Sequence, residues 1–164
     1  MEPLIALVSV TLVLLAAGAA GVRRLRPWLV AVRGGIAAMF LLTGTVHFVY
    51  MREELIAMVP PVLPAPGLLI TVTGVLELAG AAGILWTRTA PWAAAGLSAL
   101  LVVMFPANAY AALADLPGAT PLIPRTAEQI VFLAAPVAVL AHHLHTRHRT
   151  RAADAAPPLA PAAR

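Results

Sequence analysis

The sequence predicts an all-α polytopic membrane bundle, with a four-helix core and one extra N-terminal transmembrane helix. Of its 164 residues, 61% are hydrophobic and 11% are charged, whereas typical globular proteins have about 45–50% and about 25% respectively. So little charge cannot cover a water-exposed surface, and disordered chains are poor in apolar residues. Five apolar stretches, separated by arginines, approach the ~20 residues that a helix needs to cross a bilayer. We therefore expect the chain to reside in a lipid bilayer.

The first apolar stretch, residues 4–22, predicts a transmembrane helix that forms a unit of its own (residues 1–25). It contains no ionisable side chain, and a chain that crosses lipid must be helical because lipid satisfies no free amide or carbonyl group. A cleaved signal peptide is the alternative, since the Ala-Gly-Ala at 17–19 resembles a cleavage site. Signal peptides begin with positive charge, but here the arginines follow the apolar run. A retained helix is the favoured interpretation.

The next four apolar stretches predict the core bundle, residues 26–146. They cover residues 28–50, 67–86, 92–113 and 126–144. The loop 51–66 holds a short apolar turn followed by four prolines, which suggests a piece lying at the membrane surface. Thr126 and Gln129 have the spacing of a capping box, which predicts that the last helix begins there. The tail, residues 147–164, is expected to be disordered and cytoplasmic because it has little to bury.

The arginines indicate the orientation of the chain in the membrane. With five spans, Arg52 and Arg125 fall on one side. The other side receives Arg23, Arg24, Arg26, Arg88, Arg147, Arg149, Arg151 and Arg164. Because loops rich in lysine and arginine stay in the cytoplasm, we predict an outer N-terminus and a cytoplasmic C-terminus, in the bacterial cytoplasmic (inner) membrane.

Polar side chains inside the spans are the candidate site residues. An ionisable group at the centre of a membrane helix costs about 2.5–3.5 kcal/mol and usually faces the bundle interior. Glu77 lies near the middle of its span, and at a rise of ~1.5 Å per residue His47 and Asn108 lie about 10 Å nearer the outer face. We predict that these three point into one cavity that opens toward the outer face. The full set of ligand-binding or proton-handling candidates is His47, Glu77, Asn108, Thr43, Thr73 and Gln129.

Structural roles are the alternatives for the same side chains. Glu77 would then be a neutral carboxyl hydrogen-bonded to another helix, or it would form an ion pair with Arg33. Asn108 would bond a backbone carbonyl that Pro106 leaves free. Gln129 would be a helix cap.

Other kinds of site are not expected. The chain has no cysteine, which excludes disulfides and thiolate metal sites. Residues 142–148 include four histidines, but no carboxylate accompanies them and the neighbouring arginines repel a cation, so we expect no metal site. The net charge of +4 follows from membrane topology, because the basic residues form no patch, and we expect no nucleic-acid partner.

Four short motifs follow one another along the core. They are Gly-Thr-Val-His-Phe at 44–48, Val-Pro-Pro-Val-Leu-Pro at 59–64, Gly-Val-Leu-Glu-Leu at 74–78 and Phe-Pro-Ala-Asn at 105–108. In this order and spacing, together with Arg33, Arg125 and Gln129, they resemble the DoxX family of small bacterial integral membrane proteins. The resemblance covers about residues 33–140 and implies a four-helix membrane bundle, here the second to fifth spans.

The resemblance also implies a function. Named DoxX relatives include a quinone-linked thiosulfate oxidoreductase subunit and a membrane component of oxidative-stress complexes. We therefore expect a redox-associated subunit of a membrane complex, with a quinone as the implied ligand of the outer cavity and no cofactor motif in the chain itself. The partner would be another membrane-complex protein or a second copy of the chain, and whether the subunit is catalytic stays open.

Two other functions fit the same residues. A non-catalytic assembly or anchoring subunit would use its polar groups only to fix helix register. A small-molecule transporter acting as an oligomer is the second alternative, although the chain lacks the inverted repeat common in transporters.

Overall fold

Helices make up the structure of this chain. The computed structural model describes residues 2–154, with side chains through residue 150, and contains no strand in that range. The elements are α1 (Glu2–Ala19), the short 3-10 helix η1 (Arg23–Leu25), α2 (Trp28–Val46), α3 (Arg52–Met58), α4 (Pro66–Leu85), α5 (Ala90–Leu113) and α6 (Leu122–Asp154).

Five of the described helices, α1, α2, α4, α5 and α6, are long and apolar enough to cross a membrane. Each corresponds to one of the five apolar stretches in the sequence. The predicted all-α membrane bundle is therefore confirmed, and the chain is a multi-pass membrane protein. Helix α3, of 7 residues, occupies the proline-rich loop between the second and third spans.

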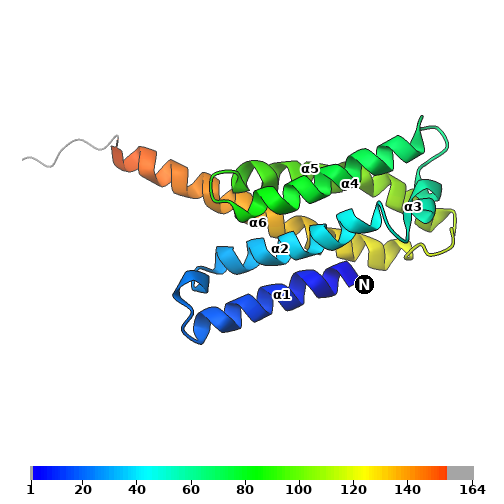
Figure 1. Cartoon of the computed structure of the whole chain (residues 1–164). Helices are drawn as coiled ribbons and strands as arrows, with labels where there is room; N and C mark the ends of the chain where they lie inside the picture. Colours follow the sequence, from blue (N-terminus) through cyan, green and yellow to red (C-terminus); the bar gives the residue numbers. More distant parts are fainter. Residues whose placement is uncertain (1, 155–164) are drawn as a thin grey trace, which may run out of the picture.

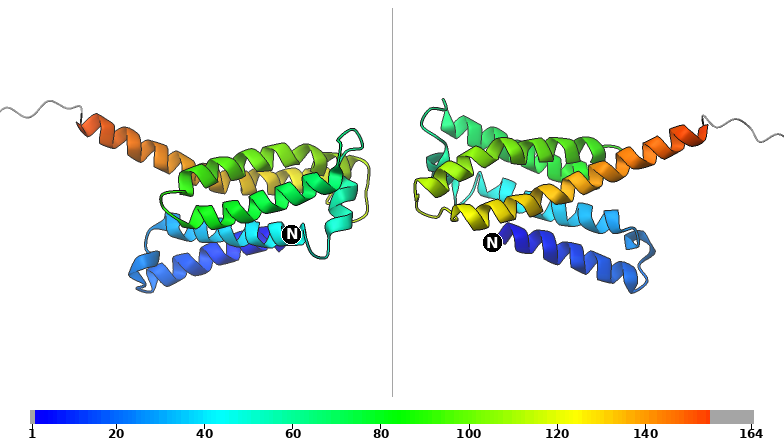
Figure 2. Two further views of the ribbon diagram at one scale, coloured as in Figure 1. Left: turned by 45° about the horizontal axis from the view of Figure 1, so that its top comes forward. Right: turned by 180° about the vertical axis from the view of Figure 1, so that it is seen from behind.

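Helix α2 lies at the centre of the bundle (Figures 1 and 2). Helices α1, α4 and α6 pack against it, and α5 closes the bundle by packing against α4 and α6. About 44% of the apolar window of α2 is buried inside the protein, compared with 11% for α1. Helix α1 is therefore peripheral and leaves most of its surface to lipid. The largest fully buried side chains are Ile36, Met39, Phe40, Ile84, Pro136 and Val139.

Glycines allow α2 and α4 to approach closely. A Cβ atom built on Gly74 would lie 2.6 Å from the Cβ of His47, and one built on Gly44 would lie 3.2 Å from the Cβ of Glu77. Both distances are shorter than an ordinary contact between side chains. Small residues at a membrane-helix interface bring the backbones together, and here they place His47 beside Glu77.

The two ends of the bundle differ (Figure 1). The start of α1, the short helix α3 and the loop between α5 and α6 lie at one end, here called the α3 end. The segment η1 and the turn between α4 and α5 lie at the other, here called the η1 end. Because five helices alternate in direction, α1 begins at the α3 end and α6 leaves at the η1 end. Which end faces the cytoplasm stays a prediction.

Helix α6 differs from its expected bounds at both ends. It begins at Leu122, one turn before Thr126, whose hydroxyl donates to the backbone O of Leu122 at 2.7 Å. The predicted capping box is therefore wrong, because Thr126 lies inside the helix. At its other end α6 extends past the bundle to Asp154 (Figure 1). Residues 147–154 of the expected disordered tail are thus helical, and residues 155–164 lie outside the described part.

Candidate functional site

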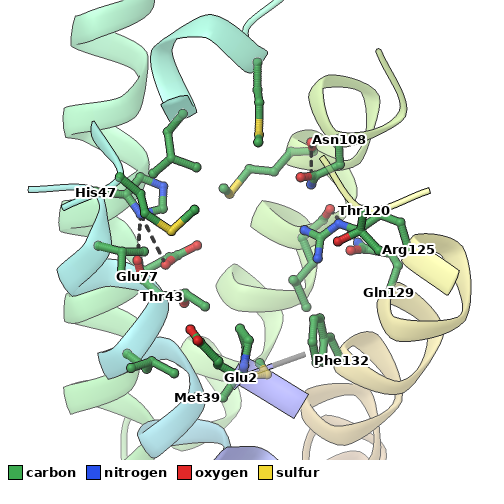
Figure 3. A pocket seen from close by; sticks show the side chains of 18 of the residues that line it. Glu2, Met39, Thr43, His47, Glu77, Asn108, Thr120, Arg125, Gln129 and Phe132 are labelled. Carbon is green, nitrogen blue, oxygen red and sulfur yellow. Dashed lines mark hydrogen bonds and ion pairs between the residues drawn. The ribbon is translucent and has the colours of Figure 1, made fainter. Parts of the chain in front are cut away.

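A cavity of about 280 Å³ lies inside the bundle at the α3 end (Figure 3). Five of the six candidate side chains line it, and they come from four different helices. Thr43 belongs to α2 and His47 is the C-cap residue directly after it. Glu77 belongs to α4, Asn108 to α5 and Gln129 to α6. His47, Glu77 and Gln129 are buried, with at most 8% of their surface exposed.

Three of these residues form an acid–base cluster on the α2–α4 side: Thr43, His47 and Glu77. The Nδ1 atom of His47 lies 2.8 Å from the backbone O of Thr43 and 3.8 Å from Oε2 of Glu77 (Figure 3). A carbonyl oxygen only accepts hydrogen bonds, so Nδ1 carries a proton and donates it to Thr43. Neutral His47 therefore presents its other ring nitrogen, Nε2, as a hydrogen-bond acceptor.

Some buried polar atoms of the acid–base cluster form no hydrogen bond within the described part of the protein. Within residues 2–150, no side chain or backbone group forms a hydrogen bond with His47 Nε2 or Glu77 Oε2, although both atoms are buried. In the same range, the buried hydroxyl of Thr43 has only the carboxyl group of Glu77 as a side-chain partner. A buried polar group left without a hydrogen bond costs about 1–3 kcal/mol, and native proteins pair almost all such groups. Because these atoms border a cavity, a bound molecule can supply the missing partners.

Asn108 and Gln129 face the cluster from the opposite wall, and both side chains already make hydrogen bonds. Asn108 Nδ2 donates to the backbone O of Met104 at 3.2 Å, and Gln129 Nε2 donates to the backbone O of Leu101 at 2.7 Å. Asn108 thus bonds the carbonyl one turn before itself, which is not the carbonyl that Pro106 leaves free. Gln129 links α6 to α5 and does not cap its own helix.

A positive charge also borders the cavity on this opposite wall. Arg125, in the first turn of α6, lines the cavity and donates from Nη1 to Oε2 of Glu128 at 3.3 Å. Figure 3 shows Arg125, Asn108 and Gln129 across the cavity from the acid–base cluster. The apolar side chains that also line the cavity include Phe40, Leu101 and Phe132. The cavity therefore combines two polar walls with apolar surface, which suits a compact ring that carries polar groups at opposite edges.

Methionine side chains contribute much of the apolar lining. Met39, Met51, Met58 and Met104 all line the cavity, and they are all the methionines that follow the first residue. Leu55 falls between Met51 and Met58 at helical spacing, so one face of α3 covers the cavity at its end. Methionine is flexible and polarisable, and it adapts to the irregular outline of a ligand.

Arg52 anchors α3 over the cavity. Its Nη1 donates to the backbone O of His47 at 3.1 Å. Its Nη2 donates to the backbone O of Gly67 at 3.2 Å and to Oγ1 of Thr71 at 3.0 Å. One guanidinium therefore joins α3 to the end of α2 and to the first turns of α4. The cover of the cavity and the backbone of His47 are held by the same side chain.

Thr73 is the candidate that the structure places elsewhere. It does not line the cavity, and its hydroxyl donates to the backbone O of Leu69 at 2.9 Å and of Ile70 at 3.1 Å in its own helix. Thr73 is one turn from Glu77, but the buried contact of α4 with α2 runs through Gly74 and Glu77. Although Thr73 and Glu77 are spaced to share a helix face, Glu77 reaches the cavity and Thr73 does not.

The ion pair between Arg33 and Glu77 does not form. Arg33 Nε donates to the backbone O of Ile84 at 2.5 Å, and its Nη2 donates to the backbone O of Leu85. These carbonyls end α4, where the helix dipole favours a cation. Glu77 lies about two turns earlier in α4 and has His47 within ion-pair distance instead.

Several lining residues were not among the sequence candidates. Met51, Leu55 and Met58 belong to the segment whose short apolar turn predicts a position at the membrane surface, and that pattern does not predict a contact with the cavity. Arg125 contributes to the predicted topology and to the DoxX resemblance, but neither places it at a site. Glu2, at the start of α1, also lines the cavity, and no local pattern predicts this because its position depends on how α1 packs against α2.

Comparison with known families identifies the family to which the chain belongs. Residues 36–147 match the family described as "Domain of unknown function (DUF8561)". The matched region contains all five candidates that line the cavity, and α1 lies before it. No curated protein and no solved structure matches the chain. Because the match spans more than half of the 164 residues, the chain belongs to the DUF8561 family.

Proposed function

We propose that this membrane protein binds a small lipid-soluble redox molecule of the quinone class in the cavity at the α3 end, as a redox-associated subunit of a membrane complex. One observation carries the proposal. His47 Nε2 and Glu77 Oε2, which lack hydrogen-bond partners among the described residues, are buried together on the wall of a largely apolar cavity. The resemblance to the DoxX family supports the choice of a quinone over other apolar ligands.

The size of the cavity is compatible with a quinone ring. An apolar cavity of about 150 Å³ in a protein is large enough to bind benzene, and this cavity measures about 280 Å³. It is slightly smaller than most pockets for drug-sized ligands, which begin near ~300 Å³. A substituted ring therefore fits, whereas a long isoprenoid tail would have to leave the cavity toward lipid.

The acid–base cluster is arranged to take a proton from the ligand. Because Nδ1 of His47 already donates to Thr43, Nε2 can accept a hydrogen bond from a hydroxyl group, such as that of the reduced form of a quinone. When His47 takes up that proton, Glu77, 3.8 Å from Nδ1, would stabilise the imidazolium in its carboxylate form. A bound quinone would supply the two-electron chemistry, while His47 and Glu77 would hold and move one of the two protons that its reduced form releases.

Ligand-induced stabilisation tests the proposal. A short-chain quinol analogue, added at about 100 times its Kd, should stabilise the wild-type protein by about 2.7 kcal/mol and raise its melting temperature in detergent. His47→Leu should lose this increment, because leucine neither accepts nor donates a hydrogen bond. His148→Leu is the matched control, since His148 lies near the end of α6 and does not line the cavity. No increment in the wild type, or an equal increment in His47→Leu, would contradict the proposal.

An assembly subunit without a ligand is the second candidate function. The observation that favours it is the position of His47 and Glu77 at the close contact of α2 with α4, where Gly44 and Gly74 lie. There, polar groups can fix the register of two helices. For such a subunit, His47→Leu would lower the melting temperature in the absence of any analogue, and the analogue would stabilise neither protein.

A further inference from the structure

A second hollow, of about 400 Å³, lies near the η1 end of the bundle. The first residue of α2, Trp28, forms one wall, and one face of α6 forms the rest, including Ala138, Ala141, His142, His145 and Arg149. We call it the Trp28 groove. None of its residues lines the cavity at the α3 end, so this inference does not depend on the proposed function.

The Trp28 groove changes from apolar to polar along α6. Ala138 and Ala141 come first, then the imidazoles of His142 and His145, and finally the guanidinium of Arg149. At ~1.5 Å per residue, Arg149 lies about 16 Å beyond Ala138 along the helix axis. Tryptophan favours the boundary between hydrocarbon and headgroups, and Trp28 starts the α2 span. The groove therefore runs from hydrocarbon depth to headgroup depth.

The groove is preformed and accessible. The ring of Trp28 packs edge-on against the imidazole of His142, with ring centroids 5.8 Å apart and planes at 88°, yet 46% of Trp28 stays exposed. His145 Nδ1 lies 3.0 Å from the backbone O of Ala141 and donates to it, which leaves Nε2 for another partner. The side chain of Arg149 is also exposed.

The groove carries a positive charge and no negative one. Arg149 is always positive, and no aspartate or glutamate lines the groove. A free phosphate would engage the cationic end but would leave the alanines and the indole ring uncovered. An anionic phospholipid matches both ends, since basic pockets between membrane helices bind such headgroups.

We propose that the Trp28 groove is a binding site for an anionic phospholipid. The phosphate lies beside Arg149 and His145, and an acyl chain runs along Ala138 and Ala141 against the indole of Trp28. The lipid joins the start of α2 to the part of α6 that extends beyond the bundle.

Native mass spectrometry of the full chain in mild detergent tests this site. Palmitoyl-oleoyl phosphatidylglycerol and phosphatidylcholine share their acyl chains and differ in headgroup charge. The wild type should bind the anionic lipid at least about five-fold more tightly. One basic residue near an anionic headgroup contributes about 1 kcal/mol, which corresponds to a factor of about five. Arg149→Gln should therefore weaken binding of phosphatidylglycerol about five-fold, and His145→Gln should weaken it in the same direction.

Arg147→Gln is the matched control. It removes the same charge two residues away, about 200° around the helix, from a residue that does not line the groove. It should change the affinity for phosphatidylglycerol less than two-fold. Equal losses in Arg147→Gln and Arg149→Gln would show diffuse attraction and overturn the proposal, as would equal binding of the two lipids by the wild type. Displacement of phosphatidylglycerol by an equal concentration of inorganic phosphate would overturn the lipid as the occupant.

Discussion

Substituting Gly74 by alanine tests whether the close contact of α2 with α4 positions His47. The added Cβ would lie 2.6 Å from the Cβ and 3.0 Å from the Cγ of His47, and 2.9 Å from Cε2 of Phe48. Ordinary van der Waals contact begins at 3.4 Å, so the shortest of these distances falls about 0.8 Å short. The Cβ of His47 moves only with its backbone, so α2 and α4 must separate at this point, and the imidazole is displaced with them.

The size of the effect follows from two opposing contributions. Alanine is favoured over glycine inside a helix by about 0.8–1.0 kcal/mol, whereas an extra methyl group in a packed interface costs about 1–3 kcal/mol. Gly96→Ala in α5 isolates the first contribution, because a Cβ there meets nothing within 4 Å. The stability difference between the two variants is thus the packing cost alone, about 1–3 kcal/mol.

Thermal melting in detergent measures this difference. For a chain of this size, each kcal/mol shifts the melting temperature by about 2–4 °C, so Gly74→Ala should melt several degrees below Gly96→Ala. The quinol-analogue increment should also fall in Gly74→Ala and persist in Gly96→Ala, because only the first substitution displaces His47. Equal melting temperatures together with equal ligand increments would refute the argument that this contact sets the geometry of the acid–base cluster.

Three further predictions concern the ionisable residues and the topology. Glu77→Gln should reduce the analogue increment, because the amide cannot supply a negative charge beside His47, and it should change ligand-free stability by less than about 1 kcal/mol, since membrane hydrogen bonds average about 0.6 kcal/mol. Glu53→Gln, on the exposed side of α3, should keep the increment, and a full increment in Glu77→Gln would show that the charge of Glu77 plays no part in binding. Arg52→Met should release α3, because charged hydrogen bonds contribute about 1.5–3 kcal/mol each. Amide hydrogen exchange over residues 52–58 should then become at least about ten-fold faster, and unchanged exchange would mean that apolar contacts alone hold α3. A reporter that is active only in the cytoplasm should give signal when fused to the C-terminus, and a silent but well-expressed fusion would contradict the predicted orientation.

Local sequence was sufficient to predict the helices. Lipid leaves a crossing chain one favourable conformation, so the length of an apolar stretch predicts a membrane helix directly. Depth along each helix was also readable, because the rise per residue is constant. His47 and Asn108 were therefore expected near one level, and both line one cavity.

Helix ends were less predictable than helix positions. The residues from Leu122 onward are already helical and continue without a break into the membrane span. Helix α6 therefore begins one turn before the capping signal at Thr126. Its other end continues to Asp154, because residues beyond the apolar stretch still add helical hydrogen bonds to a helix that is already nucleated.

The partners of the polar side chains were decided by the tertiary structure. Sequence spacing placed Thr73 with Glu77, but the rotation of α4 against α2, set by Gly44 and Gly74, left Thr73 outside the cavity. Opposite charges suggested a pair between Arg33 and Glu77, but Arg33 lies beside the last carbonyls of α4 and bonds those instead. Which groups meet depends on helix rotation and pairing, and small residues and side-chain shape set both across the whole bundle. An apolar pattern that is nearly uniform around each helix carries little of that information.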